Sequence, residues 1–102
     1  MSETILQEAQ RVRGEREAAY GHPFDDYART ARMWEAILGL PPYRISPSVA
    51  CLMMAAVKIS RQCHAPKRDN MTDLAGYAAC AQMCAEREEA LHEQSVDGMG
   101  GA

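Results

Sequence analysis

Helix-breaking residues divide this sequence into four segments, and within each segment the apolar residues recur at three- and four-residue steps. The three breaks lie at residues 20–23, 39–47 and 65–66, where Gly permits a left-handed turn and Pro ends or restarts a helix. No segment alternates apolar and polar residues as a half-buried strand would. The sequence therefore predicts an all-α fold, arranged as a four-helix antiparallel bundle.

Capping residues mark where these helices begin. Small residues around Gly76 predict that another helix approaches the last one closely. Residues 1–94 form the expected single domain, and residues 95–102 an expected flexible tail. The predicted helices are a first from Thr4 or Ser2 to before Gly21, a second over residues 24–38, a third from Ser46 and Pro47 to near residue 64, and a fourth from Asp69 or Asn70.

The hydrophobic residues are mostly small or soft. Of the 102 residues 47% are hydrophobic, but this share rests on Ala, seven Met and four Cys, with one Trp and one Phe. Such a core buries little area per residue and leaves a small stability margin. We therefore expect the chain to complete its core with a second copy of itself, as a homodimer or higher oligomer.

The third helix is predicted to be the central one. It is apolar almost all round until Lys58, which indicates burial on more than one face, including the stripe that carries Val49 and Leu52. In the second helix, the stripe that runs from Trp34 to Leu38 is expected to face the core, with Trp34 as an anchor.

The charge of the chain limits its partners. The formal net charge is −3 and the pI is near 5.5, whereas a protein that coats nucleic acid needs a basic face to displace counterions from the phosphates. No apolar run approaches the roughly 18 residues that span a bilayer, and residues 1–4 lack the form of a signal peptide. The Cys residues lie in helical segments, not at the spacings of a disulfide framework. These features predict a cytoplasmic protein that binds neither membrane nor nucleic acid.

Charged residues gather where the third helix meets the fourth. Lys58 and Arg61 share a face because they are three residues apart, and Asp69, Asp73 and Tyr77 align at four-residue steps. If these helices pack antiparallel, the corner could hold a phosphate between the cations and the helix N-terminus, with the carboxylates holding Mg²⁺. The alternative is structural: Asp73 forms an ion pair with Lys58 or Arg61 that fixes the helix register, and Asp69 serves as a cap.

The tight turn at residues 20–23 is the second candidate. His22, with Asp25 and Asp26 at the start of the next helix, could bind a metal ion or the edge of a base. The alternative is again structural, because Gly and Pro make turns and Asp residues cap helices. Zinc is disfavoured, because its Cys ligands normally lie two to four residues apart in loops. The candidate zinc ligands would be Cys63, His64, Cys80 and Cys84.

Several of these residues form short motifs in a fixed order. The motifs are Gly14-Glu15-Arg16, Tyr20-Gly21-His22-Pro23, Trp34, Lys58-x-x-Arg61 and Asp69-x-x-x-Asp73-Leu74-Ala75-Gly76-Tyr77. In this combination they resemble a family of small proteins from actinobacterial phages and their hosts, catalogued as a domain of unknown function, over most of residues 5–85. For a phage-encoded chain the resemblance implies the cytosol of the infected host.

The chain is more distantly similar to the all-α nucleoside-triphosphate pyrophosphohydrolases of the MazG-like group. The similarity lies in a helix that carries Lys58 and Arg61 and is followed by a helix that begins with spaced acidic residues. That likeness implies dimers or tetramers, Mg²⁺ held by an E-x-x-E type and an E-x-x-D type pair, and attack of activated water on a phosphate. This chain departs from the pattern. Its second helix offers Asp26 and Glu35 but no E-x-x-E pair, and its later acids are four residues apart instead of three.

The sequence thus predicts a protein that binds a nucleotide or related phosphate ligand, with hydrolysis of a nucleoside triphosphate to monophosphate and pyrophosphate as the activity to test first. The alternative is a non-catalytic helical oligomer that binds a host protein or sequesters a nucleotide. The predicted site residues are Lys58, Asp69 and Asp73 as catalytic residues, Tyr20, His22, Arg61 and Tyr77 as binding residues, and Asp26, Glu35, Asp69 and Asp73 as Mg²⁺ ligands.

Overall fold

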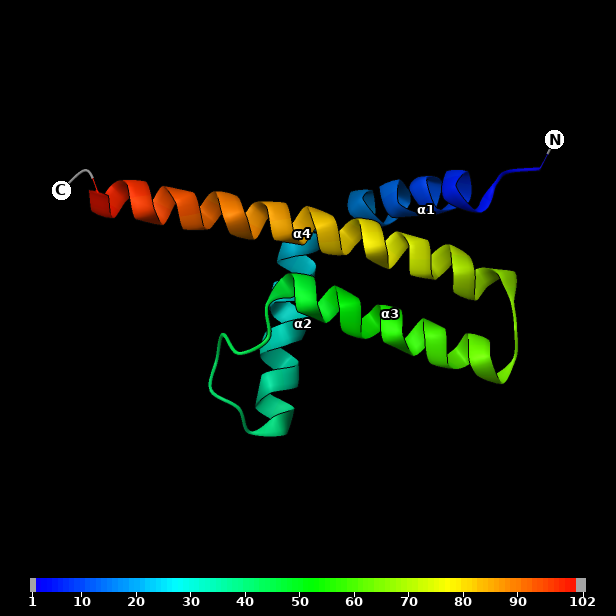
Figure 1. Ribbon diagram of the computed structural model, residues 1–102, viewed down its shortest axis with the longest axis horizontal. Helices are drawn as coiled ribbons and strands as arrows, with labels where there is room; N and C mark the ends of the chain where they lie inside the picture. The colour runs from blue at the N-terminus through cyan, green and yellow to red at the C-terminus, as the bar shows by residue number, and fades with distance from the viewer. Residues whose placement is uncertain (1, 101–102) are drawn as a thin grey trace.

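The computed structural model describes the backbone of residues 2–100 and the side chains of residues 2–95, and every regular element in this range is an α-helix. The helices are α1 (Ile5–Tyr20), α2 (Pro23–Leu38), α3 (Pro47–His64) and α4 (Arg68–Gly100) (Figure 1). The predicted all-α fold of four helices is confirmed.

Local capping contacts set most of the helix ends near the predicted positions, whereas α4 begins at Arg68, before the predicted caps Asp69 and Asn70. The Thr4 hydroxyl accepts a hydrogen bond from the backbone N–H of Gln7, and the Gln7 side chain accepts one from the backbone of Thr4. The Ser46 hydroxyl accepts from the N–H of Val49 at the start of α3. Gly39 ends α2 in the left-handed conformation, with φ at 72°. These boundaries follow from contacts between near neighbours in the sequence.

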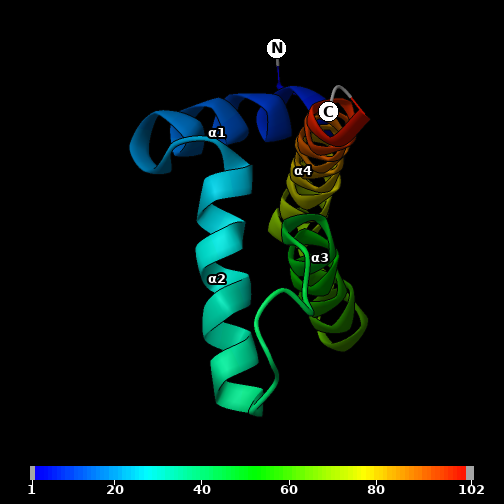
Figure 2. The same ribbon diagram turned by 90° about the vertical axis from the view of Figure 1, so that its left-hand side faces the viewer.

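The helices are not all aligned. α3 and α4 form an antiparallel hairpin, and α1 packs against the first half of α4 (Figure 1). α2 runs steeply across the hairpin instead of along it (Figures 1 and 2). Ala31 of α2 and Ala50 of α3 belong to one buried cluster at this crossing, with Tyr27 and Trp34 packed beside them. Side chains this small let two helices cross closely at one point. α2 therefore projects away from the other helices and does not lie antiparallel beside them as the sequence predicts.

The buried core consists mainly of small side chains. Trp34 packs against it, as predicted. Much of the predicted apolar stripes is exposed, however: Ile37 is 80% exposed, Leu38 63%, Val49 45% and Leu52 56%. For these residues the predicted burial is wrong in the single chain, because α2 crosses α3 at Ala31 and Ala50 and does not cover the outer side of α3 or the end of α2. The buried hydrophobic residues are Ala9, Ala31, Ile45, Ala50, Cys51, Ala55, Tyr77, Ala81 and Cys84.

The connector between α2 and α3 is held by one buried carboxylate. Glu35 is 1% exposed, and its oxygens accept hydrogen bonds of 2.6–3.2 Å from the side chain of Arg32 and from the backbone N–H groups of Tyr43, Arg44 and Ile45. Arg32 also lies over the ring of Tyr43, whose φ of 66° is a left-handed value. The Arg32 contact and then the backbone N–H groups lower the pKa of Glu35 to about 2, although burial opposes this. Glu35 thereby fixes where α3 begins.

The C-terminal helix is the longest, and its backbone is helical through Gly100. The side chains of residues 96–100 and the whole of residues 101–102 lie outside the described residues, so the flexibility predicted for residues 95–102 stays a prediction. None of the described helices is both long and apolar enough to cross a membrane.

Candidate functional site

A cavity of about 120 Å³ lies between α1, α2 and α4. An apolar cavity of roughly 150 Å³ in another protein holds benzene, so this volume is of the order that admits one planar ring. The lining residues with polar or aromatic side chains include Arg13, Arg16 and Tyr20 of α1, Asp26 and Tyr27 of α2, and Asp73 and Tyr77 of α4.

The floor of the cavity is aromatic and its mouth is polar. Tyr77 is buried and meets Tyr27 edge to face, with ring centroids 6.4 Å apart and an interplanar angle of 80°. Burial raises the pKa of Tyr27, so its phenol is neutral at neutral pH and can donate or accept a hydrogen bond. Tyr20 and Arg16 are exposed and mark the mouth. A flat ring could therefore lie inside while a charged group stays at the rim.

Ion pairs occupy most of the charged groups around the cavity. The Lys58–Asp73 pair joins α3 to α4, and its side chains are 14% and 24% exposed. The sequence predicts this contact as the structural alternative to a phosphate site. The pairs are Arg13 with Glu17 at 3.0 Å, Arg29 with Asp26 at 3.7 Å and Lys58 with Asp73 at 2.7 Å.

Among the described residues that line the cavity, Arg16 is the basic residue that is not in one of these ion pairs. Within residues 2–95 no carboxylate lies within 4.0 Å of its guanidinium nitrogens. Partial burial works against its charge, but the Tyr77 hydroxyl and the more distant Asp73 carboxylate outweigh that, so the pKa of Arg16 is raised. A permanent positive charge at the mouth is a suitable partner for an anionic ligand group.

Gly76 keeps one wall of the cavity open. It lies in the interior of α4, where Gly is about 1 kcal/mol less favourable than Ala. A Cβ atom added at Gly76 would meet no atom within 4 Å apart from its own helix backbone. The space beside Gly76 itself therefore belongs to the cavity, whereas the nearby Ala81 is buried in the cluster that includes Cys51 of α3.

The structure brings together only part of the predicted site. Tyr20, Asp26, Asp73 and Tyr77 line the cavity, and Lys58 reaches its edge through the ion pair with Asp73. The other predicted residues lie elsewhere. Arg61 and Asp69 are exposed, His22 caps α2 by accepting the N–H of Phe24 through Nδ1, and Glu35 is buried in its contacts with the connector.

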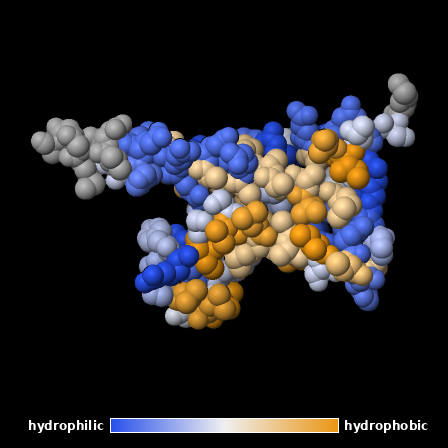
Figure 3. Space-filling model, viewed as in Figure 1, coloured by the Kyte–Doolittle hydropathy of each residue, from blue (hydrophilic) through white to orange (hydrophobic). Residues whose placement is uncertain are grey.

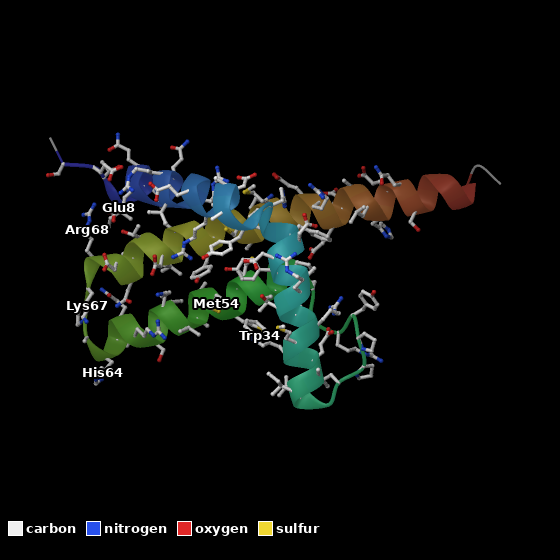
Figure 4. All side chains as sticks on the ribbon, turned by 180° about the vertical axis from the view of Figure 1, so that it is seen from behind. Glu8, Trp34, Met54, His64, Lys67 and Arg68 are labelled. Atoms are coloured by element: carbon white, nitrogen blue, oxygen red, sulfur yellow. The ribbon has the colours of Figure 1, made fainter. Side chains whose placement is uncertain are left out.

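The turn between α3 and α4 is tied down by side chains of both helices. The Gln62 side-chain oxygen accepts hydrogen bonds from the backbone N–H of Lys67 and from the side-chain amide of Asn70. Asn70 therefore bonds to Gln62 and does not cap α4 as predicted. Arg68 reaches α1, where it pairs with Glu8 at 3.2 Å (Figure 4). Gln62 therefore ties the end of α3 to the turn and to α4, and Arg68 ties the start of α4 to α1.

The predicted Mg²⁺ ligands do not fit a metal site within one chain. In the part of the chain whose side chains are described, no three His, Cys, Asp or Glu residues are grouped closely enough to hold a metal ion. Glu35 already accepts five hydrogen bonds. Cys51 and Cys84 are buried with their sulfurs 3.8 Å apart, and burial raises the pKa of Cys84 to about 11, which keeps it a neutral thiol.

Of the α1 side chains at the cavity, sequence reasoning found only Tyr20. Arg13, Arg16 and Glu17 line the cavity, and so does Tyr27, which the sequence pattern placed only in an apolar stripe. A signal was present, because Arg16 stands in the Gly14-Glu15-Arg16 motif and is four residues from Tyr20 on the same helix face. The steep crossing of α2, which closes the cavity, has no comparable signal.

The fold and the cavity define a small all-α protein whose first, second and fourth helices enclose one ring-sized space. Residues 4–85 match the family described as Domain of unknown function (DUF6378), and the chain belongs to this family. It is similar to the Gene 55 protein of Mycobacterium phage D29, with 37% identity over 100 residues that cover 96% of this chain. The chain spans 60% of the length of that phage protein. No solved structure matches the chain.

Proposed function

We propose that this protein binds a nucleotide, or a phosphate-bearing small molecule of similar build, in the cavity between α1, α2 and α4. The observation that carries the proposal is the combination of an aromatic floor with one cation, Arg16, left over at the mouth. A planar base would pack against the rings of Tyr27 and Tyr77, and a phosphate would pair with Arg16. The hydroxyl groups of the floor can donate or accept hydrogen bonds with the edge of a base.

Binding is supported more directly than hydrolysis. The likeness to MazG-like enzymes suggests release of pyrophosphate from a nucleoside triphosphate, a reaction that in that group uses several converging carboxylates and Mg²⁺. Here the cavity offers Asp26, Asp73 and Glu17, each of which is in an ion pair. Further carboxylates would have to come from a second chain. The residues of a single chain thus support binding of a nucleotide without its hydrolysis.

Isothermal titration calorimetry with each nucleoside, monophosphate, NTP and dNTP tests the proposal. We expect at least one nucleotide to bind, and Arg16→Gln to weaken its affinity about tenfold, as loss of one charge-assisted contact would, without changing the affinity for the matching nucleoside. Arg11→Gln is the control, because Arg11 lies on the same helix outside the cavity and pairs with Glu3 and Glu15. Heat signals for no nucleotide would refute binding. Pyrophosphate release in the presence of Mg²⁺ or Mn²⁺ would add hydrolysis.

The stability of an Asp73→Asn variant tells an ion pair from a metal ligand. Removing this charge leaves the mostly buried Lys58 ammonium without its partner, so we expect a loss of roughly 1–2 kcal/mol in the free energy of unfolding. If Asp73 were instead held close to other acids as a metal ligand, its replacement would leave the protein as stable as wild type or more stable, because the acids repel one another. Urea denaturation of both proteins gives the difference, and Asp69→Asn, an exposed acid one turn earlier on α4, should change stability by less than about 1 kcal/mol.

A further inference from the structure

The outer side of α3 is apolar and exposed along most of the helix. Val49 is 45% exposed, Leu52 56%, Met53 39%, Val57 37% and Ile59 50%. Figure 3 shows this hydrophobic surface over α3 and down to the free end of α2. We call it the α2/α3 face. The exposed large hydrophobic residues of α2 and of the segment just after it are Met33, Ile37, Leu38 and Leu40, each at least 42% exposed.

The α3 part of this face carries no charge. From Pro47 to Ser60 the single charged residue of α3 is Lys58, and Lys58 is turned toward Asp73 of α4. A helix face that remains in water normally carries charged residues, so an uncharged exposed stripe of this length marks a contact surface. It also suits contact with an identical surface, because two copies of a chain with net charge −3 can meet there without opposing like charges.

The surface area of the chain agrees with a missing partner. The chain exposes 7026 Å², whereas a compact monomer of 11.3 kDa exposes about 5700 Å². The projecting end of α4 accounts for part of this excess. Stable interfaces bury about 800 Å² of each partner, which is within the difference.

The core supplies the reason why the partner must be permanent. Ile45 is the one large aliphatic residue among the buried residues of the described chain, while the larger aliphatic side chains of α3 lie outside. A chain that cannot bury its own Leu, Ile and Val residues needs a partner whenever it is folded. A second copy of the same chain can be this partner, because other copies are present wherever the chain is synthesised.

We propose that the α2/α3 face is the interface of a symmetric homodimer, with α3 of one copy packed against α3 of the other. The proposal does not depend on the cavity or its ligand, because the cavity lies among α1, α2 and α4. It identifies which surface buries the stripe that the sequence predicts to be internal.

Sedimentation velocity and thermal unfolding over a wide range of protein concentration test this interface. We expect wild type to sediment at twice 11.3 kDa and its unfolding midpoint to rise with concentration. Ala56→Arg places a charge in the middle of the exposed stripe and should shift the protein to monomer or lower its midpoint at a given concentration. Ala19→Arg adds the same side chain at an exposed site on α1 and should leave the dimer intact.

Two results would overturn the proposal. One is a wild-type protein that stays at 11.3 kDa with an unfolding midpoint independent of concentration, which would leave the face to a different protein. The other is a dimer that Ala56→Arg and Ala19→Arg weaken equally, because the interface would then lie elsewhere. Circular dichroism of both variants at high concentration shows whether the helices are retained, and loss of helix in Ala56→Arg that is reversed by raising the concentration supports the proposal.

Discussion

Replacing Glu35 by Gln is expected to lower the midpoint of thermal unfolding by roughly 10 °C or more. The substitution keeps the size of the side chain but removes the charge and turns one acceptor oxygen into an NH₂ group. That group would face the N–H donors of Arg32 and of the connector residues Arg44 or Tyr43, which already point at the carboxylate. Buried donors without an acceptor are costly, and the Arg32 charge loses its partner.

Differential scanning calorimetry at neutral pH measures the effect, with Glu89→Gln as the matched control. Glu89 is an exposed acid on α4, and surface substitutions of this kind usually change stability by no more than about 0.5 kcal/mol. Equal midpoints for the two variants would show that Glu35 does not hold the connector. If Glu35 instead acted only as a metal ligand, its removal would leave the midpoint unchanged or raise it.

The acid side of the stability profile reports on the same contacts. The pKa of Glu35 is lowered from 4.5 to about 2, so as the pH falls the unfolded chain takes up this proton before the folded chain does. The stabilisation from Glu35 is therefore complete above pH 4.5 and is lost between 4.5 and about 2. Wild type should lose more stability across this window than Glu35→Gln, which has no carboxyl group to protonate at this position.

Replacing Gly76 by Leu is expected to remove most of the affinity for the nucleotide that calorimetry identifies, with a loss of at least about tenfold. The new side chain would extend into the space beside Gly76, where a Cβ meets nothing within 4 Å, and would fill the place of the ligand ring. Leu also favours a helix more than Gly does, by up to about 1 kcal/mol. The variant should therefore bind less while it unfolds at the same temperature or higher.

Gly14→Leu is the matched control for this result. Gly14 is also in a helix with nothing within 4 Å of an added Cβ, but it is exposed on α1 and does not line the cavity. We expect it to gain stability from helix propensity and to bind the nucleotide as wild type does. Unchanged binding by Gly76→Leu would show that the ligand occupies a different place, and equal losses in both variants would exclude a local effect.

The ion pair between Lys58 and Asp73 shows how far spacing in the sequence can reach. Both residues belong to helices joined by a short turn, so the antiparallel register of α3 and α4 follows from the chain itself. Arg61 shares a face with Lys58 in the same pattern, yet it is exposed. The spacing of residues shows which of them share one side of a helix, but it does not show which of these residues contacts the neighbouring helix.

The sequence by itself determined the four helices, most of their ends and the family. Thr4, Gly39 and Ser46 act on groups within four residues, and such contacts do not depend on the rest of the fold. The tertiary structure alone decided three other features: the cavity, the connector held by Glu35 and the exposure of α3. Each depends on the steep crossing of α2 at Ala31, and the crossing angle of two helices is set by how their surfaces fit, which no local pattern records.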